Sequence, residues 1–246
     1  MKALIPAAGL GIRWLPWSRI IPKELLPFNN YPVIHHVLNE VVAPEIKEIG
    51  IIICKAKQLI KSYVDEIWIA NHPEIQLRWF YQSTPRGVGD ALLHAKEWVS
   101  DEPTAIIYPD EIHPKEGGIS QIFKAFQSFP CCWIGLTSKK QKRRQISLAA
   151  ERVNKSVFRI SGPYNQACVG KVRYGTGRYI LANGLSHLKG TFSQVKNQNV
   201  EEFDDSYIFA PLWGQDIRGI MLSEPIYDIG IPENWRSAVS AYIDQK

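Results

Sequence analysis

Short apolar runs alternate with amphipathic, helix-length segments along most of this chain, and that alternation limits its fold more than any other feature. It is typical of α/β proteins, in which helices cover a largely parallel sheet. We therefore predict a mixed, mainly parallel sheet flanked by helices. The expected strands are residues 3–6, 49–54, 77–81, 105–108, 132–136 and 226–229. The expected helices are residues 34–42, 59–67, 89–99, 119–126, 200–212 and a terminal helix that begins at Pro232.

The middle of the chain departs from this alternation. Residues 139–175 contain charged and β-prone fragments, which predict hairpins or a small added β region in the C-terminal half. No internal repeat and no low-complexity linker separates one part of the chain from another. Because single α/β domains often reach the length of this chain, we expect one domain that spans residues 1–246.

Charge and cysteine content argue against several classes of protein. The formal net charge is only +5, and the basic residues within 139–144 lack interleaved aromatic side chains, which favours a solvated loop over a nucleic-acid surface. No apolar run approaches the length that spans a bilayer, so we expect neither nucleic-acid nor membrane partners. The four cysteines form no CxxC pair, and the chain opens without a signal-peptide pattern. Together these features predict a reduced, cytoplasmic protein without a structural zinc site.

The first expected strand leads directly into Ala7-Ala8-Gly9-Leu10-Gly11-Ile12-Arg13. Two glycines after a strand allow the backbone to approach a phosphate and offer its amide groups, and an arginine adds a charged donor. The loop lacks the Gly-Lys-Ser/Thr of a P-loop. It also lacks the third glycine of the dinucleotide fingerprint, and the second strand ends without an acidic residue for a ribose. The sequence therefore indicates a phosphate-binding loop of another type.

The residues that follow carry a specific resemblance. Lys-Ala-Leu-Ile-Pro-Ala-Ala-Gly-Leu-Gly-x-Arg-x-Leu-Pro occupies residues 2–16, and Pro-Lys-Glu-Leu-Leu-Pro occupies residues 22–27. Together they resemble the opening signature of bacterial UTP–glucose-1-phosphate uridylyltransferases, within the sugar-phosphate nucleotidyltransferase family. Thymidylyl relatives tend to have Ser-Lys-Gln in the second motif, so Lys-Glu favours the uridylyl branch. The resemblance implies a Rossmann-like fold, with residues 1–112 as the nucleotide-binding half and residues 113–246 as the acceptor-binding half.

The resemblance also implies roles at the triphosphate. In this family the glycine loop, here with Ala8, Gly9 and Gly11, wraps the nucleotide. Arg13 and Lys23 match the catalytic residues that act at the phosphates. These roles suit the chemistry, because nucleotidyl transfer depends on charge stabilisation and in-line positioning more than on covalent help from the protein.

A second matching block begins with Gln82 and continues through residues 85–91, Pro-Arg-Gly-Val-Gly-Asp-Ala. It resembles the family's Gln-x-x-Pro-x-Gly-x-Gly-x-Ala block, in which the glutamine and the first glycine face the nucleobase. The resemblance thus implies that Gln82 and Gly87 bind the nucleotide, with Glu24 as a further contact. A glutamine side chain both donates and accepts hydrogen bonds, so it can read a pyrimidine edge.

Two aspartates match the family's magnesium ligands. Asp110 follows the apolar run 105–108, and Asp228 lies in an Asp-x-Gly within a second apolar run. Magnesium prefers oxygen ligands, usually one or two carboxylates together with substrate phosphates. The resemblance therefore implies Mg²⁺ as the cofactor, held by Asp110 and Asp228.

The sequence departs from the family mainly in the acceptor half. Ser161-Gly162-Pro163 stands where the family has Glu-Lys-Pro, whose lysine grips the sugar phosphate. Ile12 also replaces the usual threonine of the glycine loop. We take Lys171 or Arg173 as a candidate substitute for the missing lysine. Glu201-Glu202-Phe203 loosely resembles the family's sugar-binding glutamate segment, in which Glu201 or Glu202 is the candidate.

The predicted function is Mg²⁺-dependent transfer of UMP from UTP to a sugar 1-phosphate, so the predicted partners are a nucleoside triphosphate and a sugar 1-phosphate. Two alternatives stay open. The changed pocket accepts another sugar or a cyclitol phosphate, or the chain binds nucleotide without catalysis as a regulatory protein. The retained pair of aspartates favours catalysis. The oligomeric state also stays open, and a homo-oligomer is one expectation because relatives commonly form dimers or tetramers.

Overall fold

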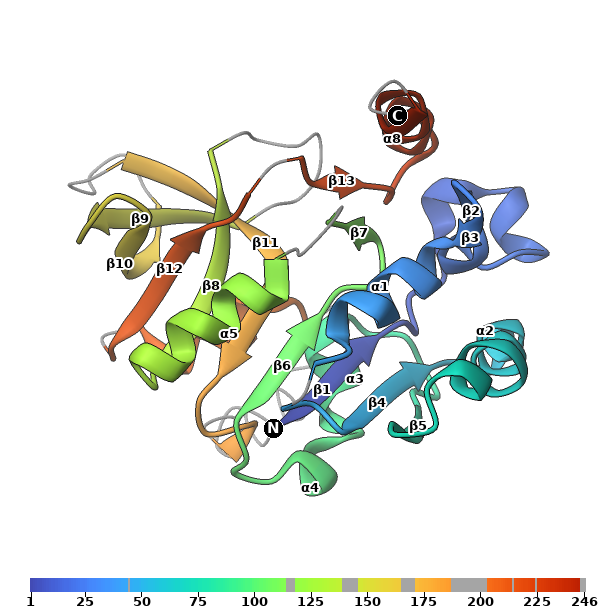
Figure 1. The fold of residues 1–246 in the computed structure, drawn as a ribbon, viewed down its shortest axis with the longest axis horizontal. Helices are drawn as coiled ribbons and strands as arrows, with labels where there is room; N and C mark the ends of the chain where they lie inside the picture. The colour runs from blue at the N-terminus through green and yellow to red at the C-terminus, as the bar shows by residue number, and fades with distance from the viewer. Residues whose placement is uncertain are drawn as a thin grey trace.

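One mixed sheet of nine strands forms the centre of the molecule (Figure 1). The computed structural model describes residues 1–43, 45–113, 118–138, 146–164, 171–186, 203–213, 215–223 and 225–243. Within these ranges the strand order is β5-β4-β1-β6-β11-β8-β12-β10-β9. The strands are β1 Lys2–Pro6, β4 Glu48–Ile53, β5 Gln76–Tyr81, β6 Thr104–Ile107, β8 Cys132–Thr137, β9 Ser147–Arg152, β10 Val157–Pro163, β11 Lys171–Leu181 and β12 Ile217–Met221.

The N-terminal side of the sheet, β5-β4-β1-β6, is entirely parallel. Successive side chains of a strand point to opposite faces, so Ile5 of β1 joins one hydrophobic cluster and Leu4 joins the other. The run Ile51-Ile52-Ile53 of β4 is buried throughout. An uninterrupted apolar strand of this kind is expected where both faces of a parallel sheet are covered.

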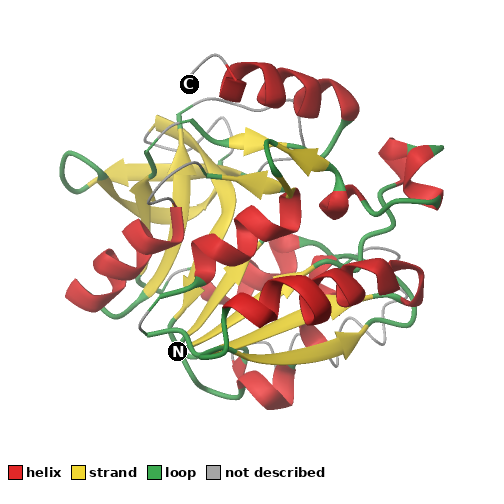
Figure 2. Cartoon of the chain, turned by 45° about the vertical axis from the view of Figure 1, so that its right-hand side comes forward, coloured by secondary structure: helices red, strands yellow, loops and turns green. Residues whose placement is uncertain are grey.

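The helices divide between these two clusters, and Figure 2 shows helices both in front of the sheet and behind it. The cluster that contains Ile5 also receives residues from α1 Val33–Val41, α2 Gln58–Tyr63, α5 Gly118–Ser128 and α8 Pro232–Ile243. The cluster that contains Leu4 receives residues from α3 Val88–Leu93, α4 Lys96–Val99 and α7 Asp205–Phe209. The predicted α/β fold with a sheet flanked by helices is confirmed.

The C-terminal side of the sheet is built differently. Strand β11 runs antiparallel to both β6 and β8, while β12 runs parallel to β8. Strand β10 is antiparallel to β12 and β9, and β9 returns to pair with the start of β11. The five strands β11, β8, β12, β10 and β9 therefore close into a ring. The β region expected in this half is thus a continuation of the main sheet, and parallel pairing predominates only on the N-terminal side.

Three expected helices differ from the structure. The segment 89–99 forms two helices, α3 and α4, because the amides of His94 and Ala95 bond three residues back instead of four. Helix α2 passes into a π-helical turn at Val64–Trp68. In the segment 200–212, helix α7 is followed by the 3₁₀ turn Ala210–Leu212, and residues 200–202 lie outside the described residues.

A second, two-stranded sheet lies beside the end of β6. It pairs β7 Glu111–Ile112 with β13 Tyr227–Asp228 in antiparallel register. Helix α8 begins at Pro232, as predicted, and contacts β13 (Figure 1). A short hairpin is formed by β2 Pro27–Phe28 and β3 Tyr31–Pro32. The strand expected at 226–229 is therefore present in shortened form, outside the main sheet.

The described residues bear on two further predictions, which are the absence of a membrane partner and the reduced state of the cysteines. No helix there is both long enough and apolar enough to cross a bilayer. Cys54, Cys131 and Cys132 carry free thiols. Cys168 and the basic segment 139–144 lie outside the described residues.

Candidate active site

A cleft of about 890 Å³ lies where β1, β5 and β6 end, at their carboxyl ends. Ligands of open α/β sheets gather at this edge. The residues predicted from the sequence that line it are Ala8, Gly9, Gly11, Arg13, Lys23, Glu24, Gln82, Gly87 and Asp110. One cavity is therefore lined by residues that are far apart in the chain and that the sequence predicts to act on a single nucleotide.

The glycine loop forms one wall of the cleft. It runs from the end of β1 into the 3₁₀ turn Ile12–Trp14. The Trp14 ring is buried, and its Nε1 donates to the carbonyl oxygen of Ile229 at 3.1 Å. Trp14 also packs edge-on against Trp235 of α8, with ring centroids 6.0 Å apart. The loop is thus anchored to the segment that carries Asp228, through a tryptophan that no sequence motif singled out.

Lys23 and Asp110 form an ion pair at the floor of the cleft. Lys23 opens the 3₁₀ turn Lys23–Leu25, and both side chains are at least nine-tenths buried, with Nζ donating to Oδ2 of Asp110. A lysine ammonium only donates and a carboxylate only accepts. The predicted phosphate-binding cation and the predicted metal-binding carboxylate are therefore in direct contact.

Asp228 lies beside Asp110 through the pairing of β13 with β7. Asp228 is opposite Glu111 in that pair, and the amide of Ile229 donates to the carbonyl oxygen of Asp110 at 2.9 Å. The Asp228 carboxylate accepts from the amide of Gly230 at 2.7 Å and from Asn234 Nδ2 at 3.3 Å. The short two-stranded sheet therefore brings the backbones of the two aspartates predicted to hold magnesium next to each other, although they lie in opposite halves of the sequence. Asp110 lines the cleft, and Asp228 is not among its lining residues.

Glu111 is a third carboxyl group in this region, and the sequence did not mark it. Its Oε2 accepts from the Gly177 amide at 2.8 Å. Burial raises the pKa of Glu111 to about 7, and the neighbouring Asp110 and Asp228 carboxylates add to the rise. The Arg178 guanidinium and the Gly177 amide act in the opposite direction. Glu111 thus titrates near neutrality beside the two carboxylates that are predicted to hold magnesium.

The donor set suits magnesium only if the substrate completes it. No group of three or more His, Cys, Asp or Glu side chains that could hold a metal occurs among the described residues. Magnesium is usually bound through one or two carboxylates, substrate phosphates and waters. Asp110 and Asp228 supply oxygen donors only, next to a cleft whose other wall is a glycine loop. The chemistry of these residues fits a magnesium ion shared with a phosphorylated ligand.

Arg178 holds the floor of the cleft in place. Its guanidinium is fully buried and pairs with Glu40 of α1 through Nε and NH2, the latter at 2.7 Å. The remaining donors reach the carbonyl oxygens of Tyr108 at 2.9 Å, Gly177 at 3.2 Å and Glu111 at 2.7 Å. All five N–H groups are used, which a buried arginine requires. A register shift in β11 between Gly175 and Tyr179 accompanies this inward-facing arginine.

Burial alone would raise the pKa of Glu40, but the Arg178 guanidinium outweighs it and holds that pKa below its usual value. His113 itself is buried behind this pair, and burial lowers its pKa to about 4. Neither ring nitrogen of His113 has a hydrogen-bond partner among the described residues. The network is therefore an ionised Arg178–Glu40 pair packed against a neutral imidazole.

Gln82 and Gly87 also line the cleft. Gln82 follows β5, is buried, and donates from Nε2 to Asp90 Oδ2 at 2.6 Å and to the Gly87 carbonyl oxygen at 3.2 Å. Gly87 has φ +98°, and a Cβ there would lie 2.4 Å from the carbonyl oxygen of Phe203. Only glycine satisfies both conditions. Asp90 was not predicted as a site residue.

Glu24 lines the cleft but is already paired. Its Oε2 accepts from Lys57 Nζ at 2.6 Å, and both side chains are almost fully buried. Lys57 lies in the 3₁₀ turn Lys55–Lys57 that follows β4. The sequence marked Glu24 and not its partner, because nothing local relates residue 24 to residue 57.

The acceptor predictions fall largely beyond the described residues. Glu201 lies outside them, and so does the side chain of Lys171, although its backbone begins β11. Residues 161–163 lie in β10 and are not among the cleft-lining residues. Arg173 places its guanidinium 5.0 Å from the ring centre of Phe158 instead of in the cleft. Among the described lining residues Arg13 and Lys23 are the cations, and both are residues predicted to act at the triphosphate.

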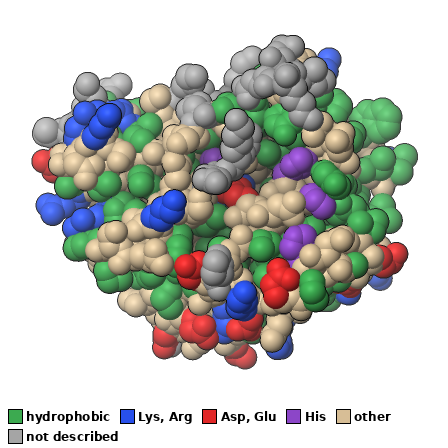
Figure 3. All heavy atoms as spheres, viewed as in Figure 1, with side chains coloured by type: hydrophobic (Ala, Val, Ile, Leu, Met, Phe, Trp, Pro, Cys, Tyr) green, Lys and Arg blue, Asp and Glu red, His purple; other side chains and the backbone are tan. Residues whose placement is uncertain are grey.

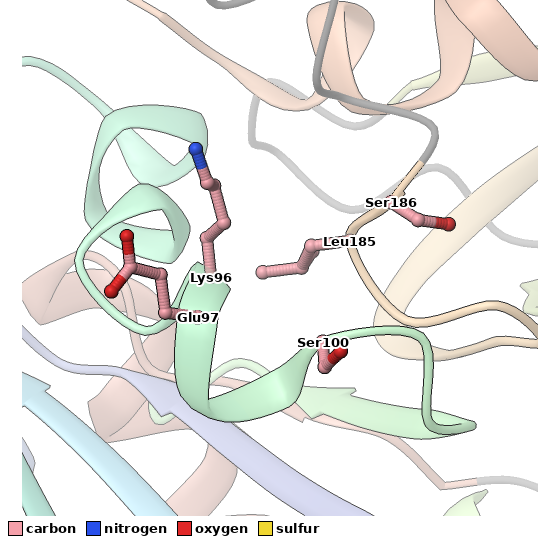
Figure 4. A pocket seen from close by; sticks show the side chains of 5 residues that line it. All are labelled: Lys96, Glu97, Ser100, Leu185 and Ser186. Carbon is pink, nitrogen blue, oxygen red and sulfur yellow. The ribbon is translucent and has the colours of Figure 1, made fainter.

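Two other features lie away from the cleft. A pocket of about 270 Å³ next to α4 is lined by Lys96, Glu97, Ser100, Leu185 and Ser186, and Figure 4 shows the Leu185 side chain pointing towards Lys96. Histidine side chains lie near the middle of the face in Figure 3. Helix α1 carries His35 and His36. His35 of α1 stacks on Tyr31 at 4.0 Å and contacts the Tyr63 hydroxyl at 2.9 Å. Neither feature shares a residue with the cleft lining.

Comparison with known proteins gives a consistent result. A family model described as nucleotidyl transferase matches residues 2–142. A Bacillus subtilis protein, provisionally named UTP–glucose-1-phosphate uridylyltransferase, is 27% identical over 256 residues, which cover 95% of this chain and 93% of that protein. A Mycoplasma pneumoniae UTP–glucose-1-phosphate uridylyltransferase is 35% identical over 154 residues, which cover 55% of this chain and 53% of that protein.

The fold itself is shared with solved structures. A UDP-glucose pyrophosphorylase in complex with UDP-glucose superposes with a TM-score of 0.82 at 23% identity, and the match covers 100% of this chain and 99% of that one. The likeness extends over both halves of the molecule, including the ring of strands on the C-terminal side.

Proposed function

This chain belongs to the nucleotidyl transferase family, and from that premise we propose that it transfers UMP from UTP to a sugar 1-phosphate and releases pyrophosphate. One observation carries the proposal. The glycine loop, Arg13, Lys23 and Asp110 line a single cleft, and Asp228 pairs in the strand beside Asp110. The names of the B. subtilis and M. pneumoniae relatives support the choice of UTP and of a sugar 1-phosphate.

The chemistry at the triphosphate follows from these residues. An oxygen of the acceptor phosphate forms a bond to the α-phosphorus of UTP, and the bond from that phosphorus to the bridging oxygen of the β-phosphate breaks. Pyrophosphate departs with that oxygen. Amide groups around Gly9 and Gly11 bind the phosphates, and Arg13 with Lys23 stabilises charge on the transition state and the leaving group. None of these residues needs to form a covalent bond to substrate.

We propose that Asp110 and Asp228 hold a magnesium ion. When bound, the ion would neutralise charge on the triphosphate and the acceptor phosphate. The ion pair between Lys23 and Asp110 keeps the lysine at the floor of the cleft before substrate binds. Arg178 and Glu40 act on the same floor, because they fix the backbone of Tyr108 and Glu111 on either side of Asp110.

The base is proposed to lie between Gln82 and Gly87. Gln82 is the one side-chain amide among the described lining residues, and its apolar neighbours in the lining include Val88 and Ala91. A flat, uncharged ring with alternating donors and acceptors suits that end of the cleft better than the end with Arg13 and Lys23. Glu24, paired with Lys57, would support the wall beneath it.

The acceptor pocket supports a change of specificity within the same chemistry. The family's sugar-phosphate lysine is replaced here at residues 161–163, and the described acceptor side of the cleft is lined instead by Tyr108, Thr176, Tyr179 and Phe209. Another sugar phosphate or a cyclitol phosphate is therefore the second candidate for the acceptor. The continuous sheet supports treating residues 1–246 as one domain, and the free thiols suit a reducing, cytoplasmic location.

The test is pyrophosphate release by the purified protein in magnesium chloride. UTP, dTTP, CTP, ATP and GTP are each combined with a panel of sugar and cyclitol 1-phosphates. Release that requires UTP together with a sugar 1-phosphate supports the proposal. Release from UTP with a cyclitol phosphate, but with none of the sugar 1-phosphates, supports the second acceptor candidate. Silence across the whole panel, in folded protein, would contradict the assignment of catalysis.

A further inference from the structure

We propose that Asp90 is a positioning residue that fixes which end of the Gln82 amide faces the nucleobase, and thereby selects a pyrimidine that carries an N3–H. The proposal deepens the proposed function and rests on the base lying beside Gln82. A glutamine amide can turn by 180° and exchange its donor for its acceptor. A glutamine alone therefore cannot distinguish uracil from cytosine.

The contacts of Gln82 remove this freedom. Its Nε2 donates to Asp90 Oδ2 at 2.6 Å and to the Gly87 carbonyl oxygen at 3.2 Å, so both hydrogens of the amide are used. Each partner is an acceptor that has no hydrogen to donate in return. If the amide turned, its oxygen would face a carboxylate oxygen and a carbonyl oxygen at hydrogen-bond distance. That arrangement is repulsive and leaves a buried polar group unsatisfied.

Asp90 is itself held in an accepting state. It lies in the first turn of α3, is buried, and accepts through its other oxygen from Arg86 NH2 at 3.0 Å. Arg86 only donates, so both oxygens of Asp90 are occupied by donors. Because this carboxylate can only accept hydrogen bonds, Gln82 must turn its NH2 group towards it, and the orientation of the Gln82 amide is fixed.

The group that remains for a ligand is the Gln82 carbonyl oxygen. No donor among the described residues reaches Oε1, and Gln82 lines the cleft. A fixed acceptor suits the N3–H of uracil or thymine. Cytosine presents an unprotonated N3 at the same place, which would face Oε1 without a hydrogen between them. The geometry thus favours UTP over CTP, and it does not separate UTP from dTTP.

Asp90→Asn is the most informative change. The substituted side chain would keep its shape, but Arg86 would claim its oxygen because arginine only donates. The new amide nitrogen would then face Gln82 and favour the turned amide, while the Gly87 carbonyl would still favour the original one. The ratio of UTP to CTP affinity should therefore fall by roughly tenfold without reversing, as expected for the loss of one oriented hydrogen bond.

The experiment measures calorimetric binding of UTP and of CTP, each with magnesium chloride, to the wild-type chain, Asp90→Asn, Gln82→Met and the double variant. Asp65→Asn is the matched control, since Asp65 also accepts from a side chain, Trp79 Nε1 at 2.9 Å, outside the cleft lining. We expect the UTP-to-CTP ratio to fall in all three cleft variants and to stay unchanged in the control. The double variant should match Gln82→Met, because Asp90 acts through Gln82. If the role of Asp90 were merely structural, Asp90→Asn would lower the affinities for UTP and CTP alike and leave their ratio unchanged.

Binding is chosen over turnover so that two failures can be told apart. A wild-type chain that prefers UTP to CTP but releases no pyrophosphate would contradict the proposed function and leave this inference standing. An Asp90→Asn variant that keeps the wild-type ratio within twofold would overturn the inference. If Asp90→Asn does not fold, Gln82→Met still decides, because an unchanged ratio there removes the amide from base selection.

Discussion

The two ends of the cleft are built on different principles. At the nucleotide end, the strands β1, β5 and β6 belong to the parallel side of the sheet, and each delivers a short motif directly after its last residue. At the acceptor end, the wall comes from β11, which is antiparallel to its neighbours and breaks its register with β8 between Gly175 and Tyr179. The first end is local in sequence, and the second depends on pairings between distant segments.

This difference explains why a resemblance can be strong in one half and patchy in the other. Binding a triphosphate needs backbone amides and fixed cations, and few local sequences can supply them. An acceptor pocket needs only a suitable shape and a few polar groups, which many combinations of distant residues provide. Arg178 joins the two ends, because it lies in β11 and bonds the backbone on both sides of Asp110.

Substitution of Arg178 should have the largest effect on the free energy of unfolding. Arg178→Met leaves the Glu40 carboxylate buried without its partner, and the free energy of unfolding should fall by about 3–5 kcal/mol. Denaturant unfolding of both proteins measures the change. Arg218→Met is the matched control, because its partner Asp216 is exposed and the expected loss there is below about 1 kcal/mol. Equal losses in the two variants would contradict the role given to Arg178.

Asp110→Asn should separate chemistry from folding at the nucleotide end. Turnover should fall by roughly 10²–10³-fold, comparable with the loss of one group that stabilises transition-state charge. Asn keeps the side-chain volume, so circular dichroism should match that of the wild-type chain. Steady-state pyrophosphate release is the measurement, with Asp65→Asn as the control. Normal turnover in Asp110→Asn would remove this carboxylate from the mechanism.

The buried imidazole behind the Arg178–Glu40 pair should make stability depend on pH. The pKa of His113 is about 4 in the folded chain, against a reference value of 6.5. As pH falls through this window the unfolded chain binds a proton that the folded His113 does not, so His113 by itself contributes a loss of about 3 kcal/mol. Glu111 contributes in the opposite sense, because its pKa of about 7 lets the folded chain bind a proton before the unfolded chain does. His113→Asn should therefore lose less stability on acidification than the wild-type chain, measured by denaturant unfolding between pH 4.5 and 7. Parallel curves would show that His113 does not cause the dependence.

The smallest effect is expected at the changed acceptor motif. Gly162 has φ +147°, and no heavy atom lies within 4 Å of a Cβ built there. Gly162→Ala should therefore lose about 1 kcal/mol from backbone strain alone, and its affinity for UTP should stay within twofold of the wild type. Thermal unfolding and calorimetry measure the two quantities. A large loss of UTP affinity would mean that the two ends are more strongly coupled than the contacts indicate.

The sequence predicted five of the nine strands of the main sheet individually, β1, β4, β5, β6 and β8, and it singled out the glycine loop, Lys23, Gln82 and Asp110, which line the cleft. The roles of these residues at a nucleotide stay predictions. Buried strands such as 49–54 can be recognised from their own continuous apolar residues. The glycine loop can be recognised because the close approach of backbone to phosphate requires glycines directly after a strand. Asp228 lies in the strand that pairs beside Asp110, and in the sequence the two are linked only by the similar form of their motifs.

The remaining features could not be predicted because they arise between distant residues. The partner of Glu24 is Lys57, and the ring of strands closes when β9 meets β11. No local sequence pattern around residue 178 indicates that its guanidinium donates to the backbone carbonyl oxygens of residues 108 and 111. Asp90 reads locally as a favourable helix-entry residue, and its contact with Gln82 becomes apparent only once α3 is placed against the end of β5.

The most direct test of the nucleotide end is single-turnover pyrophosphate release from UTP and glucose 1-phosphate in Lys23→Met, beside the wild-type chain and the surface variant Lys61→Met. If glucose 1-phosphate is inactive, the best acceptor from the panel replaces it. We expect wild-type rates in Lys61→Met and a loss of about 10²-fold or more in Lys23→Met, because Lys23 is proposed to stabilise the departing pyrophosphate at the floor of the cleft. Wild-type rates in Lys23→Met would contradict this role.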